Sequence, residues 1–170
     1  MWQDQGTGAE LGAEPSPTGE RDPIAVFGLN GIVEGTIPKV DGRLTESLAE
    51  VQRVQIRATP THGSAGGRVV IDLDDVIAVA APPRPPSPYR VARRHHVLEI
   101  DAGPYRVRGV AHLPLGADPE RYVASAPRKW LPLTDCTVGA GGDEWEVEVV
   151  ILNLDYASRR ERSYHAPRFG

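Results

Sequence analysis

The sequence predicts a mainly β protein made of two tandem units, each a small barrel or sheet with the order strand, strand, short helix, strand, strand. Three observations support this fold class. An Asn30-Gly31 pair lies between two apolar segments, and both of its positions favour the positive φ of a tight hairpin turn. Other segments alternate apolar and polar residues, as a sheet with one buried face requires. The same order of elements then occurs twice, in residues 24–80 and in residues 91–156.

The first unit opens with this hairpin and continues into a short helix. Leu44, Leu48 and Val51 are spaced i, i+4 and i+7, which places them on one helical face. A Gly-rich turn, HGSAGG, separates the last two apolar segments of the unit. The predicted elements are strands at residues 24–29, 32–37, 53–59 and 68–80 and a helix at 41–52.

The second unit repeats this pattern. Gly35 and Gly109 occupy the same point of the returning strand in each predicted hairpin. Asp118 is suited to cap a helix whose first position is Pro119, because proline lacks the N–H that this position leaves unbonded. The predicted elements are strands at residues 95–100, 105–113, 129–138 and 144–156 and a helix at 116–127.

Three segments outside the two units have a different composition. Residues 1–23 are acidic and poor in apolar side chains, so they are predicted to be a disordered tail. Residues 81–90 contain five prolines, which favour an extended linker. Residues 157–170 form a polar and basic tail. Because a unit of roughly 55 residues buries little surface, the two units are expected to pack together and share a core.

The bulk properties narrow the class of protein. The 170-residue chain has a net charge of -4, which argues against indiscriminate attraction to nucleic acid or to an anionic membrane. A single cysteine, Cys136, rules out a disulfide within the chain. No apolar run is long enough to span a membrane, and the N-terminal residues do not resemble a signal peptide. We therefore expect a cytoplasmic protein without membrane association.

Candidate catalytic and metal-binding residues are scarce. Cys136 lies in LTDCTV and is expected to be a buried small side chain. Asp72 and Asp74 share one face of a strand, which suits either a divalent cation or a solvated outer face. The GSAGG segment lacks the lysine and the helix of a phosphate-binding loop. The sequence therefore predicts neither an enzyme nor a cofactor or metal site.

The basic residues near the linker are the remaining signal. With Tyr89 or Tyr105 as a stacking partner, they would provide the combination of charge and aromatic rings that binds single-stranded nucleic acid. The alternative is a solvated strand edge whose arginines prevent strand-to-strand aggregation. The candidate nucleic-acid-binding residues are Arg90, Arg93, Arg94, His95, Arg106 and Arg108.

Two partial resemblances accompany these patterns. The run VFGLNGIVEGTI, with Asp41 after it and VIAVAAPPR further on, resembles Sm-like proteins of the bacterial Hfq type, which implies a small β-barrel that binds RNA. The acidic IDLDD stands where those proteins carry a basic Tyr-Lys-His stretch, and LTESLAEV interrupts their continuous bent sheet. Residues 97–156, with an LPLTD core, resemble small bacterial domains of unknown function, a likeness that implies no activity.

Two functions follow as hypotheses. The first is a non-enzymatic binding or scaffold module, whose protein partner or second copy docks on a sheet edge or on the seam between the two units. The second is binding of RNA or single-stranded DNA through the basic residues named above.

Overall fold

The computed structural model describes residues 10–11, 19–61, 65–85, 91–125, 129–157 and 163–165. Within them the protein is mainly β, as predicted, with few helical turns. The strands are β1 (Glu10–Leu11), β2 (Arg21–Gly28), β3 (Gly31–Pro38), β4 (Arg53–Ala58), β5 (Gly67–Asp72), β6 (Val76–Ala81), β7 (Arg93–Ala102), β8 (Tyr105–Pro114), β9 (Trp130–Ala140), β10 (Asp143–Asn153) and β11 (Ser163–His165). The helices are α1 (Leu44–Glu50) and α2 (Pro119–Ala124), with 3₁₀ turns η1 (Leu73–Asp75) and η2 (Leu154–Tyr156).

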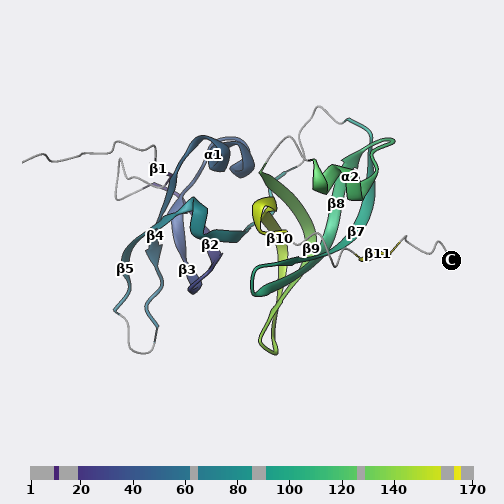
Figure 1. The fold of residues 1–170 in the computed structure, drawn as a ribbon. Coiled ribbons are helices and arrows are strands. Elements are labelled where there is room, and N and C mark those ends of the chain that lie inside the picture. Colours follow the sequence, from purple (N-terminus) through teal and green to yellow (C-terminus); the bar gives the residue numbers. More distant parts are fainter. Residues whose placement is uncertain are drawn as a thin grey trace, which may run out of the picture.

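All the strands belong to one sheet, whose order is β1-β4-β3-β2-β6-β10-β9-β8-β7-β11, with β5 paired to β4. Figure 1 shows the first half of the chain, in purple and blue, beside the second half in green, with β10 running between them. Every pairing within a half is antiparallel except the short parallel contact between β1 and β4. The two halves join where β6 pairs antiparallel with β10, with Val79 opposite Ile151.

The predicted hairpins and helices form at the expected places. Strands β2 and β3 form the predicted hairpin, but Gly28 pairs with Gly31, so the turn residues are Leu29 and Asn30 rather than Asn30 and Gly31. Neither Leu29 nor Asn30 has a positive φ, and Gly31, with φ 131°, is the first residue of β3. Asp118 caps α2 by accepting a hydrogen bond from the backbone nitrogen of Arg121 at 2.8 Å. Leu44 and Leu48 of α1 are buried, as their spacing predicted.

The two halves do not share a single core. One buried cluster, centred on β7–β10, also takes Phe27 and Ile77 from the first half, and the other, centred on β2–β5, takes Trp130 and Ile151 from the second. Alternate residues of a strand point to opposite faces, so the β6–β10 junction contributes to one core on each side of the sheet. The first five residues of β6 are consequently all buried.

The boundaries differ from the prediction at three places. Strand β2 begins at Arg21, inside the segment predicted as a tail, and Glu10–Leu11 pair with β4. The strand predicted at residues 68–80 is broken by η1, because the backbone nitrogen of Leu73 donates to the carbonyl oxygen of Gln52 at 2.9 Å and turns the chain. Of the predicted linker, residues 86–90 lie outside the described part of the chain. In the described part of the predicted linker, Arg84 donates hydrogen bonds to the carbonyl oxygens of Val40 and Gly42.

Candidate functional site

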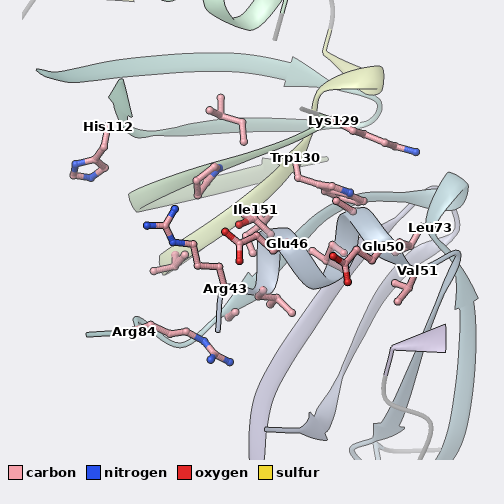
Figure 2. Close-up of a pocket in the computed structure, with 18 of the residues that line it drawn as sticks. Arg43, Glu46, Glu50, Val51, Leu73, Arg84, His112, Lys129, Trp130 and Ile151 are labelled. Atoms are coloured by element: carbon pink, nitrogen blue, oxygen red, sulfur yellow. The ribbon is translucent and has the colours of Figure 1, made fainter. Parts of the chain in front are cut away.

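An open groove follows the seam between the two halves and encloses about 2410 Å³. Figure 2 shows α1 along one wall and residues of β9 and β10 along the other. We call it the seam groove and define it by six of its lining residues, Arg43, Glu46, Glu50, His112, Trp130 and Ile151.

The first wall is the outer face of α1. Because Leu44 and Leu48 point into the core, Glu46 and Glu50 lie on the part of the helix that borders the groove. Arg43 precedes the helix and Glu50 ends it, so these two charges are separated by the helix length of roughly 10 Å. The helix therefore presents a base at one end of the groove and an acid at the other.

The second wall is apolar in its middle. Trp130 and Ile151 are 4% and 3% exposed, respectively, and belong to the core of the first half although they lie on β9 and β10. Beside them Lys129 makes ion pairs of 3.3 Å with both Asp74 and Asp155. This lysine joins η1 to η2 and so connects the two halves at the acidic end of the groove.

A histidine pair lines the opposite end. His95 and His112 stand directly opposite each other on β7 and β8, with ring centroids 4.4 Å apart. The Nε2 atom of His112 lies 2.9 Å from the hydroxyl oxygen of Thr134, and Arg93 donates to the His112 carbonyl oxygen at 3.0 Å. Burial, together with the nearby His95 and Arg93, lowers the pKa of His112. The His112 ring is therefore a neutral hydrogen-bonding group at pH 7.

The charges of the seam groove are divided between its ends. Arg43 and His112 lie toward one end in Figure 2, and Glu50 lies toward the other. Arg93 accompanies His112 at the basic end, while Asp74 and its neighbour in η1 line the acidic end. Lys129 and Arg53 also line the acidic end, where they pair with Asp74 and Asp72. The groove thus combines a basic end, an acidic end that holds two paired bases, and exposed apolar lining from Pro132 and Val91.

The residues predicted to bind nucleic acid are dispersed along the β7–β8 hairpin. Arg106 and Arg108 are exposed on one face of β8, as expected, but they lie near the turn, opposite Asp101 and Glu99. The Nε atom of Arg106 is 2.7 Å from Asp101 Oδ1. The carboxylates therefore reduce the positive potential at this end.

The other candidates lie at the open end of the same hairpin. Arg93 and His95 line the seam groove, whereas strand alternation directs Arg94 to the opposite face. Arg90, like Tyr89, lies outside the described residues. Arg108 pairs with Glu99, which follows His95 by four residues on β7. Arg108 therefore lies roughly 13 Å along the hairpin from His95.

The remaining candidates have structural surroundings. Cys136 is buried, and burial raises the pKa of its thiol to about 11, so the thiol is protonated at neutral pH. Asp72 forms an ion pair with Arg53 at 3.0 Å, and Asp74 pairs with Lys129. Among the described residues, no three His, Cys, Asp or Glu side chains converge as metal ligands would. No helix in the described part of the chain is long and apolar enough to cross a membrane.

Comparison of the chain with protein-family models, with curated proteins and with solved structures found no match. The seam between the units was named as a docking place, but the residues that line the groove were not predicted, because they are brought together only through the β6–β10 junction. One sequence signal was available: Glu46 and Glu50 are four residues apart on the face of the helix opposite its buried leucines.

Proposed function

We propose that this protein is a non-enzymatic cytoplasmic binding module and that its ligand is a segment of another protein held in the seam groove. The observation that carries the proposal is that one groove brings together basic residues around Arg43, acidic residues around Glu50 and an exposed apolar side chain, Pro132. A polypeptide can carry both signs of charge and apolar side chains in one short segment. It is therefore the class of ligand that matches all three parts of the groove.

The expected ligand has a defined pattern. An acidic residue faces Arg43 and Arg93, apolar residues lie against Pro132, which is exposed on β9, and a basic residue faces Glu50. Val91, which is 70% exposed and also lines the groove, offers additional apolar surface for the middle of the ligand. A polyanion would meet the carboxylates of Glu46 and Glu50 along the helix wall, which makes nucleic acid a poorer match.

Selection from a random peptide display library tests this proposal. Peptides selected on the protein should share the order acidic, apolar, basic. Their affinity should fall at least tenfold when Glu46 and Glu50 are both replaced by arginine, because the basic end of the peptide then meets like charge. Glu144→Arg with Glu146→Arg is the matched control, since both glutamates are exposed on β10 outside the groove. Equal affinity for the two double variants would refute the assignment of the groove.

We also propose that the two halves are copies of one small barrel-like unit related to the Sm-like pattern. In each half a 3₁₀ turn, Leu73–Asp75 or Leu154–Tyr156, precedes the residue that pairs back to the first strand. These pairs are Gly28 with Val76 and Ala102 with Ala157. Each half also runs strand, strand, helix, strand, strand and 3₁₀ turn, after which the first half continues into β6 and the second into the isolated bridge of Ala157. An experimental structure in which residues 24–80 and 91–156 do not superpose would refute the duplication.

Binding of RNA or single-stranded DNA is the second candidate, favoured by the gathering of Arg93, His95 and Arg43 at one end of the groove. Fluorescence anisotropy with short labelled RNA and DNA, measured over a range of salt concentrations, distinguishes it. Nucleic-acid binding through this end requires affinity that falls steeply with salt and that is weakened by Arg93→Ala with Arg43→Ala. Absence of binding at low salt would remove this candidate and leave the protein-ligand proposal unaffected.

A further inference from the structure

Strand β5 is an edge strand with one unpaired side. It pairs with β4 over six residues from Arg53–Asp72 to Ala58–Gly67, without a shift in register, and no other described strand pairs with it. Its residues 68, 70 and 72 alternate with the partly buried residues 69 and 71 and form an exposed face. Val70 on that face is 49% exposed, which makes it one of four large exposed hydrophobic residues among those described.

This edge lacks several features that prevent strands from pairing between molecules. Natural edge strands are commonly protected by proline, by lysine, by a bulge or by a covering segment. Strand β5, GRVVID, contains neither proline nor lysine, and its pairing with β4 has no bulge. The strand is therefore able to accept a further antiparallel strand along its free side.

The sequence of β5 is complementary to itself in one register. If two copies of the strand run antiparallel with Val70 opposite Val70, then Arg68 of each copy stands opposite Asp72 of the other. The two central valines also stand opposite each other on the same face. A twofold axis through Val70 generates both ion pairs at once, as an isologous interface requires.

We propose that β5 pairs antiparallel with β5 of a second copy of this chain, with the twofold axis at Val70. Arg68 and Asp72 lie on the exposed face, where they now contact Gln55 and Arg53 of the neighbouring β4, and the ion pairs with a second copy would replace or extend these contacts. The molecule contains a comparable junction in the antiparallel pairing of β6 with β10. That junction covers Ile151 to 3% exposure, whereas Val70 is left open. This inference is independent of the seam groove.

Charge reversal tests the register directly. Light scattering after gel filtration should give the full chain a mass that rises from 18.4 kDa toward twice that value as the concentration is raised to about 1 mM, where even a dimer with a millimolar dissociation constant is about half formed. Arg68→Asp and Asp72→Arg should each weaken dimerisation at least tenfold, because each places two like-charged pairs across the axis. An equimolar mixture of the two variants should regain the dimer, since both pairs are then of opposite sign.

A second measurement covers the case in which a charge-reversed variant does not fold. Val70→Cys places a thiol on the axis, so mild oxidation should link two chains at this position much faster than in Val91→Cys, where a more exposed valine, 70% against 49%, lies outside β5. The native Cys136 is buried and does not compete. A wild-type monomer at every concentration, a dimer insensitive to both charge reversals, or equal cross-linking at the two positions would overturn the proposal.

Discussion

Replacement of Gly35 by alanine should destabilise the protein through one close contact between β3 and β4. A Cβ atom at this position would lie 2.3 Å from the carbonyl oxygen of Arg57 and 2.6 Å from Cγ2 of Ile56. The first of these atoms belongs to the backbone and cannot rotate away, so the strands must separate. Overpacking of this kind costs about 1–3 kcal/mol, and we expect the upper end. The lower entropy of unfolded alanine offsets about 0.4–1 kcal/mol, which leaves a net loss of about 2 kcal/mol.

The corresponding Gly109 of β8 should tolerate alanine better. Its added Cβ would lie 2.7 Å from the Sγ atom of Cys136, a side-chain atom, while the nearest backbone atom is the Thr134 oxygen at 3.2 Å. We expect a net loss of about 1 kcal/mol, since a side chain adjusts more readily than a strand. In a Cys136→Ala background the same substitution should cost almost nothing. The double-mutant cycle should therefore give a coupling of about 1 kcal/mol between Gly109→Ala and Cys136→Ala.

Urea unfolding followed by tryptophan fluorescence measures these differences. Gly139→Ala is the control, because its Cβ would meet no atom closer than 3.8 Å and its φ lies outside the left-handed region, as it does at Gly35 and Gly109. The expected order of stability is Gly139→Ala, then Gly109→Ala, then Gly35→Ala. The last should lower the melting temperature by about 4–8 °C. Equal stability of the Gly35 and Gly139 variants would refute the argument from close strand contact.

Three further predictions concern buried polar and titratable groups. Asn153→Ala should lower the free energy of unfolding by about 2–3 kcal/mol in urea titrations, because the buried amide donates to the Val76 carbonyl oxygen at 2.8 Å and accepts from the Asp155 nitrogen. Burial raises the pKa of Cys136 from 9.0 to about 11, so the unfolded chain loses this proton first, and stability should fall as the pH rises from 9 to 11. Cys136→Ala should flatten that part of the stability profile. Burial lowers the pKa of His96 and of His112 below 6.5, so the unfolded chain takes up these protons first. Melting temperatures should therefore decrease as the pH falls below 6.5, and less so in His112→Gln; a profile unchanged by that substitution would contradict the role given to His112.

The sequence predicted the parts of the fold that local chemistry determines. The Asn30-Gly31 pair predicted a hairpin between β2 and β3, which forms with its turn one residue earlier, at Leu29 and Asn30. Asp118 followed by Pro119 specifies a helix start without help from distant residues. Gly35 and Gly109 were noticed as a matched pair, and in the structure each one is crossed closely by the next strand. The mainly β class followed from these signals together with strand alternation.

The parts that were not predicted depend on contacts between distant residues. The alternating sequence around Leu73 does not indicate the break at η1. Its cause is a hydrogen bond from Leu73 to Gln52, and these two residues are separated in the sequence by β4 and β5. Leu11 packs against the core of the first half even though its surroundings in the sequence are acidic and polar. Composition averages over such a segment and does not detect one apolar side chain that fits a sheet edge.

In β6, by contrast, the local sequence does indicate a contact between the two halves of the chain. Its residues VIAVA form an unbroken apolar run, which indicates a strand buried on both faces rather than on one. The reason is that β10 lies beside β6 and continues the sheet into the second half.

The same junction explains why the candidate site is rigid although it spans two halves of the chain. Asn153 donates to Val76 across the β6–β10 pair, Tyr105 donates to the Gly28 carbonyl oxygen at 2.9 Å, and Tyr156 hydrogen-bonds to the Asp74 carbonyl oxygen. Each of these bonds joins one half to the other. Because buried hydrogen bonds are costly to leave unmade, the relative position of the halves is fixed by specific groups as well as by apolar contact. The walls of the seam groove are thereby held at a constant separation, which is what a binding site needs in order to recognise a ligand without first being ordered.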